Sequence, residues 1–93
     1  MSLASKRHLS RVAALGCVIC RRLSFGDTPA ELHHPRFAAG MAQRASDFLA
    51  LPVCPEHHRG SRGIHGDRSV LRQIKCDEPD LLADVIEQLE RQR

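Results

Sequence analysis

Two pairs of potential metal ligands, separated by 33 residues, constrain this chain more than any other feature. The first pair is Cys17-x-x-Cys20 and the second is Cys54-x-x-His57. Two intervening residues let both side chains of a pair reach one tetrahedral ion, and the two pairs together supply the ligands of a closed zinc site. The sequence therefore predicts a structural zinc ion. The alternative, two redox-active or core cysteine pairs, is disfavoured because a histidine replaces the second cysteine of the second pair.

A chain of 93 residues is expected to form one domain, residues 1–93, and to bury a smaller share of its surface than a longer chain. The aromatic side chains that usually fill a small core are scarce, since three phenylalanines are present and no tryptophan or tyrosine. The core is therefore expected to be thin. A structural metal ion would supply the missing stability.

The first residues do not resemble a secretory signal peptide, because the charged stretch Lys6-Arg7-His8 is followed by no apolar run. We therefore expect a cytoplasmic, reducing location, where cysteines stay as thiols and favour zinc over disulfides. No apolar stretch approaches the roughly 20 residues of a membrane span, so we expect no membrane association.

The charge is distributed unevenly along the chain, although its net value is only +3. Residues 1–26 carry five basic side chains and no acid, whereas acids collect in the last segment, from residue 77 onward. The basic part suits a nucleic-acid partner, with an ordinary solvated basic face as the alternative. The acidic segment is expected to face solvent or a partner and not a phosphate backbone.

The periodicity predicts an α+β fold that is mostly helical, with a short two-stranded antiparallel hairpin. Residues 4–15 read as a helix with Ser5 as its N-cap and Gly16 at its end. Residues 30–34 and 49–53 are the two strand candidates.

Between and after the strands the pattern is less regular. Residues 36–46 read as an irregular excursion with one helical turn, and Pro55 as the first position of a helix. Asp67 is expected to cap the next helix, and Pro79 to open the last one. Cys76 lacks a partner motif and is predicted to be a free thiol packed on the apolar side of a helix.

Four histidines remain once His57 is assigned to zinc, and a single tetrahedral site cannot use them. They are His33, His34, His58 and His65. Together with Asp47 they resemble the motif of the HNH nucleases, also called ββα-metal or His-Me finger endonucleases. The run from Glu31-Leu-His33-His34-Pro35 onward is most similar to the phage-borne recombination-enhancement (Ref) nucleases and their small prophage relatives. The resemblance covers residues 5 to about 75.

This resemblance implies a small zinc-stabilised ββα-metal domain and a role for each residue of the motif. His33 and His58 would bind the catalytic metal, His34 would be the general base, and Asp47, where the family has asparagine, would position that base. His65 is a candidate third ligand. It lies seven positions after His58 where one helical turn needs four, so the intervening glycines must loop out or His65 contacts phosphate instead.

The implied activity is hydrolysis of DNA phosphodiester bonds by a phage or prophage endonuclease. It would use a catalytic Mg²⁺, Mn²⁺, Ni²⁺ or Zn²⁺ ion beside the structural zinc, and no small-molecule cofactor. A partner in the recombination machinery is implied by the resemblance alone. Four arginines flank the motif as candidate phosphate contacts: Arg36, Arg44, Arg59 and Arg62. The alternative is a non-catalytic zinc-stabilised module that binds nucleic acid or protein.

Overall fold

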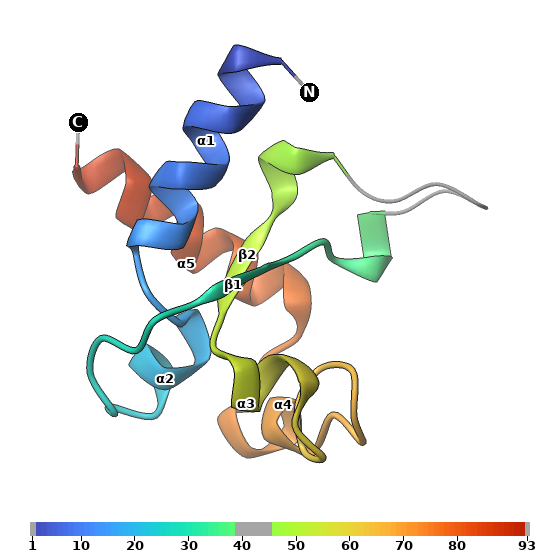
Figure 1. The fold of residues 1–93 in the computed structure, drawn as a ribbon. Helices are drawn as coiled ribbons and strands as arrows, with labels where there is room; N and C mark the ends of the chain where they lie inside the picture. Colours follow the sequence, from blue (N-terminus) through green and yellow to red (C-terminus); the bar gives the residue numbers. More distant parts are fainter. Residues whose placement is uncertain (1, 39–45, 93) are drawn as a thin grey trace.

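A two-stranded hairpin runs through the middle of the fold, with helices on either side (Figure 1). The computed structural model describes residues 2–38 and 46–92. The elements are α1 (Leu3–Ala14), α2 (Val18–Arg22), β1 (Glu31–His33), η1 (Arg36–Ala38), η2 (Asp47–Leu49), β2 (Leu51–Val53), α3 (Pro55–Arg59), α4 (Ser69–Ile74) and α5 (Glu78–Arg91), where η marks a short 3₁₀ helix. The fold is therefore α+β and mostly helical, as the sequence predicts.

The hairpin pairs β1 with β2 in antiparallel register, with Glu31 opposite Val53 and His33 opposite Leu51. All three residues of β2 are buried, because α1, α2 and α5 each contact this strand. The adjoining core is aliphatic: Val12, Leu15, Ile19, Leu51, Val53, Val70, Leu81, Val85 and Leu89. The three phenylalanines do not contribute, since each is about half exposed or more. The core thus lacks buried aromatic side chains, consistent with the thin core that the composition predicts.

The first helix begins earlier than predicted, and its cap is a different serine. Ser2 is the N-cap, and its hydroxyl accepts a hydrogen bond of 3.0 Å from the backbone N–H of Ser5. The prediction of Ser5 as the cap was wrong, because an equally suitable residue stands three positions upstream. The end of the helix is as expected. Gly16 has φ +80, a left-handed conformation that favours glycine, and turns the chain into the first cysteine pair.

Both strands are shorter than predicted, spanning three residues each within the predicted ranges. In the predicted second strand, Leu49 instead ends η2, a turn that Ser46 caps by accepting a hydrogen bond from the Phe48 N–H. The predicted helical turn after the first strand corresponds to η1. The rest of that excursion, residues 39–45, lies outside the described residues.

Helix α4 begins at Ser69, one residue later than it would if Asp67 were its N-cap. Arg68 is the N-cap, with φ 62, yet the Asp67 carboxylate still accepts a 2.8 Å hydrogen bond from the Ser69 N–H. Asp67 therefore still accepts a hydrogen bond from a backbone N–H of the first helical turn, although it lies one position before the N-cap. Pro55 is the first residue of α3, as predicted, whereas α5 begins at Glu78, one residue before Pro79.

The acidic last segment does not lie wholly in solvent. Most of its acids are exposed, but Glu78, the first residue of α5, is 4% exposed. The prediction was therefore wrong for this residue, which faces the histidine cluster described below. Among the described residues, no helix combines the length and apolar character needed to cross a bilayer.

Candidate metal centres

The two predicted half-sites come together in one cluster at the starts of two short helices. Cys17 caps α2 and Cys20 lies within it, whereas Cys54 caps α3 and His57 lies one turn inside. Cys20 Sγ lies 3.8 Å from Cys54 Sγ. His57 Nδ1 lies 3.8 Å, 3.5 Å and 3.3 Å from the sulfurs of Cys17, Cys20 and Cys54. The four ligand atoms therefore form one compact group, and it could hold a metal ion such as zinc.

The spacing of these atoms fits a tetrahedral zinc ion. With Zn–S bonds of about 2.3 Å and Zn–N bonds of about 2.05 Å, tetrahedral geometry puts sulfurs about 3.8 Å apart and sulfur and nitrogen about 3.5 Å apart. Burial raises the pKa of Cys17 to about 12, so its thiolate needs a compensating cation. Desolvation also lowers the pKa of His57, which keeps its ring in the neutral form that binds metal.

A second cluster is formed by His33, His58 and His65, whose ligand atoms lie within 4.8 Å of one another. His33 ends β1, His58 belongs to α3, and His65 lies in the loop that follows α3. His33 is buried whereas His65 is exposed, so the cluster opens to solvent on one side. Catalytic metal sites have such an open position, and closed structural sites do not.

Two carboxylates hold the rings of this cluster from behind. Glu31 Oε1 lies 2.8 Å from His58 Nδ1, and Glu78 Oε1 lies 3.1 Å from His33 Nε2. The other nitrogens face each other, with His33 Nδ1 3.2 Å from His58 Nε2. Two nitrogen ligands on one ion at about 2.1 Å stand roughly 3.0–3.4 Å apart, so this pair is spaced for a shared cation. The donor set and its spacing fit a divalent metal.

His65 reaches the cluster because the chain folds back over the end of α3. Its N–H donates to the His58 carbonyl (2.9 Å), and the preceding Ile64 N–H donates to the His57 carbonyl (2.8 Å). The approach is so close that a Cβ on Gly63 would lie 2.4 Å from the His57 oxygen. Of the two arrangements left open by the sequence, the structure adopts the one in which the glycine-containing loop brings His65 back to the cluster.

His34 lies just beyond β1 and outside the three-histidine cluster. Its Nε2 atom is 2.8 Å from Asp47 Oδ1 in η2, and the two side chains are 20% and 15% exposed. This pairing is the geometry that the motif implies for a base and the residue that positions it.

Burial and nearby charges shift the pKa values of two residues at the three-histidine cluster, His65 and Glu78. Desolvation, followed by the nearby charges of His58, His33 and Arg36, lowers the pKa of His65. For Glu78, burial alone would raise the pKa, but hydrogen bonds from His33 and the Arg36 backbone leave it below its ordinary value. Glu78 is thus held as a carboxylate at neutral pH.

The four candidate phosphate contacts differ in their surroundings. Arg36 is exposed and close enough to influence His65, whereas Arg44 lies outside the described residues. Arg59 forms two hydrogen bonds, of 2.8 Å and 2.7 Å, with Glu31. Arg62 donates to Ser69 and Gln73 and lies beside the cysteine-containing cluster.

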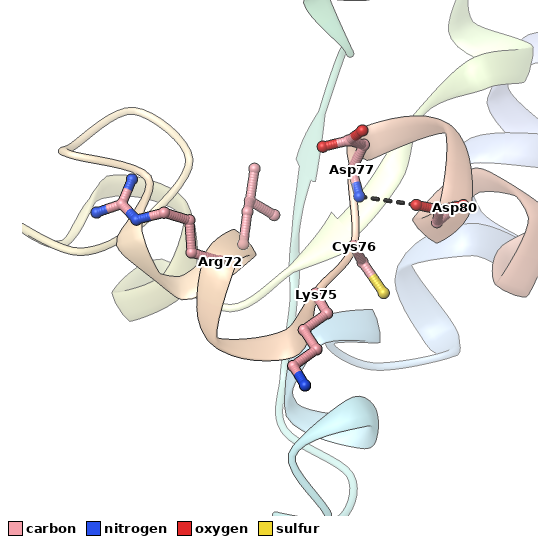
Figure 2. Close-up of a pocket in the computed structure, with 6 residues that line it drawn as sticks. Arg72, Lys75, Cys76, Asp77 and Asp80 are labelled. Atoms are coloured by element: carbon pink, nitrogen blue, oxygen red, sulfur yellow. Dashed lines mark hydrogen bonds between the residues drawn. The ribbon is translucent and has the colours of Figure 1, made fainter.

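Cys76 belongs to neither cluster. It follows the end of α4, so its predicted position on a helix was wrong, although it is a free and buried thiol as expected. Figure 2 shows it between Lys75 and Asp77, at a cavity of about 210 Å³. Burial raises the pKa of this thiol.

Glu31 and Glu78 are the site residues that the sequence interpretation missed. Glu31 had a usable signal, because residues two apart in a strand share a face and Glu31 precedes His33 by two. Glu78 had none, since it stands among solvent-facing acids more than 40 residues from its partner.

Comparison with protein-family models matches residues 2–79 to the family described as recombination enhancement, RecA-dependent nuclease. The chain belongs to this family. The match includes both clusters and the His34–Asp47 pair, and it confirms the resemblance to recombination-enhancement nucleases. Searches of curated proteins and of solved structures found no match to the chain.

Proposed function

We propose that the chain is a metal-dependent endonuclease of the HNH class that hydrolyses phosphodiester bonds in DNA. One observation carries the proposal: His34, whose ring contacts the Asp47 carboxylate, directly follows His33 of an open cluster of three histidines. The order of β1, β2 and α3, with candidate ligands at the strand end and on the helix, supports the ββα-metal assignment.

His34 would be the general base. Asp47, as a carboxylate, can only accept the 2.8 Å hydrogen bond, so neutral His34 carries its proton on Nε2 and presents a free lone pair on Nδ1. Nδ1 can then take a proton from the attacking water, and the negative charge of Asp47 stabilises the imidazolium that results. Both side chains are partly exposed, which is compatible with access of water to this pair.

His33, His58 and His65 would hold the divalent ion, which can be Mg²⁺, Mn²⁺, Ni²⁺ or Zn²⁺. When bound, the ion supplies positive charge that stabilises the transition state at phosphorus. Cys17, Cys20, Cys54 and His57 would hold structural zinc, which requires reduced thiols and suits a cytoplasmic location.

Arg36 is the best placed of the arginines to contact the phosphate next to the scissile bond, because it is exposed and near His65. Arg62 stays a candidate for a more distant contact, and Arg44, which lies outside the described residues, stays a candidate from the sequence alone. The family description names dependence on RecA, so we propose that cleavage also requires RecA on the DNA.

Plasmid nicking by zinc-loaded protein tests the proposal. Weakly bound ions are removed by gel filtration, each divalent ion is then supplied in turn, and nicking is assayed with and without RecA. Nicking that needs both the added ion and His34 supports the nuclease. One zinc per chain and no cleavage under any of these conditions would favour the non-catalytic binding module.

A further inference from the structure

We infer that Glu78 is a positioning residue of the three-histidine site, which keeps the lone pair of His33 directed at the metal position. The inference rests on the proposed function, because that site is its object. Glu78 lies at the start of α5, distant in sequence from all the histidines, and contacts the side of the His33 ring that faces away from the cluster.

The geometry fixes the proton on one particular nitrogen of His33. A carboxylate is only an acceptor, so the 3.1 Å contact with Glu78 requires the proton of neutral His33 to be on Nε2. Nδ1 then carries the lone pair, and it points at His58 Nε2 from 3.2 Å. Glu31 acts in the same way on the His58 ring, where Nδ1 donates and Nε2 is left free.

Two lone pairs facing each other at this distance repel unless a cation lies between them. Without Glu78, His33 would lower its energy by moving its proton to Nδ1 and donating it to His58. That change would occupy the nitrogen needed for the metal. Glu78 therefore stabilises an arrangement that favours a metal cation, as carboxylates behind metal-bound histidines commonly do.

Glu78 is itself held firmly enough for this role. Its Oε2 accepts a 3.0 Å hydrogen bond from the Arg36 backbone N–H, and the Arg68 guanidinium lies 3.5 Å from Oε1. The side chains of His33 and Glu78 are 1% and 4% exposed, so water cannot readily replace the contact. The start of α5 thus fixes the orientation of the His33 ring through the buried Glu78 carboxylate.

Titration of the zinc-loaded, full-length chain with Mn²⁺ is the first test. We expect Glu78→Ala to weaken Mn²⁺ binding by about 10- to 100-fold, the usual cost of removing such a carboxylate. Glu78→Asp keeps the charge but shortens the side chain, so it should also weaken binding. Glu87→Ala, which removes an exposed acid from the same helix, is the control and should bind normally.

Imidazole NMR of zinc-loaded chain without Mn²⁺ provides a readout independent of metal affinity. His33 should be in the Nε2–H form in wild type and shift toward Nδ1–H in Glu78→Ala. If Glu78→Ala loses its zinc and unfolds, the Mn²⁺ titration and the imidazole NMR are both made on Glu78→Asp instead.

The outcomes separate this inference from the proposed function. A wild-type chain that takes up no second ion, whether Mn²⁺, Mg²⁺, Ni²⁺ or Zn²⁺, overturns the proposed function and this inference together. Wild-type Mn²⁺ affinity in Glu78→Ala, or an unchanged His33 tautomer, overturns this inference alone. Weakening in Glu78→Ala with wild-type behaviour in Glu78→Asp would show an effect of charge without positioning, and would also overturn it.

Discussion

His34 Nε2 and Asp47 Oδ1 lie 2.8 Å apart and join the end of the first strand to the turn before the second. His34 is thus paired with a carboxylate, whereas His33, His58 and His65 form a separate cluster. We expect His34→Ala to reduce nicking by about 100- to 10,000-fold, the usual contribution of a general base, without changing metal content. His58→Ala should lose the second ion as well as the activity. Metal analysis beside nicking rates checks both.

Two results would contradict this division of roles. Equal loss of metal in His34→Ala and His58→Ala would make His34 a ligand. Nicking at the wild-type rate by His34→Ala would leave the proposed reaction without its base.

Removal of a cysteine ligand should unfold the protein. Cys17→Ser leaves three ligands in a buried cluster, and in a chain with a thin core the free energy of zinc binding is largely free energy of folding. The measurements are zinc content and thermal unfolding by circular dichroism. Cys76→Ser, a change at the buried cysteine outside both clusters, is the control and should keep its zinc. A cooperative wild-type melt for Cys17→Ser would exclude a folding role.

Gly63→Ala should displace His65 from the cluster. The added Cβ would lie 2.4 Å from the His57 carbonyl oxygen, which is backbone and cannot move aside easily. We expect weaker binding of the second ion, measured by Mn²⁺ titration. Ser61→Ala, an exposed change in the same loop, should bind like wild type. Unchanged Mn²⁺ affinity in Gly63→Ala would mean that the loop tolerates the shift or that His65 is not a ligand.

Uptake of the second ion should persist to slightly acidic pH. The pKa of His65 is lowered, chiefly by desolvation, so its ring stays neutral and able to bind at pH values below the ordinary histidine pKa of about 6.5. As the pH falls through the lowered pKa, protonation competes with the metal and the contribution of His65 is lost. The ratio of Mn²⁺ affinities between wild type and His65→Ala, measured across pH, should decline only below about 6.5. A decline beginning above that value would contradict the lowered pKa.

Arg36 and Arg59 should differ in their effect on DNA affinity. If Arg36 contacts one phosphate, Arg36→Ala should reduce the slope of log affinity against log salt by about one. Arg59 is paired with Glu31, so Arg59→Ala should change the slope less and act through the His58 side of the cluster. Fluorescence anisotropy over a salt series measures both slopes. The reverse order would assign the phosphate contact to Arg59.

The features of the fold and of the clusters that could be predicted are those whose sequence pattern is local. The cysteine pairs predict a common cluster because two-residue spacing is a geometric requirement of the ion, and the hairpin follows from two short apolar runs. Helix α5 follows from its apolar stripe and Pro79 in the same way. Such patterns can be read without knowing how the chain packs.

Contacts that depend on packing could not be read in this way. Glu78 resembles its exposed neighbours in sequence, and its burial follows only from where α5 meets β1. His65 has the wrong spacing for one helical turn, and its place in the cluster depends on a loop that returns across the end of α3. Ser2 and Ser5 are equivalent as caps until the start of the helix is known.

His57 and His58 are adjacent in α3, yet they belong to different clusters. A helix turns by about 100° per residue, so neighbours naturally point in different directions and one short segment can serve both clusters. An insertion or deletion of one residue here would therefore damage both clusters at once. The same adjacency would link folding to metal binding: a chain that lacks zinc in the cysteine-containing cluster would leave α3 without its anchor and the three-histidine cluster unassembled.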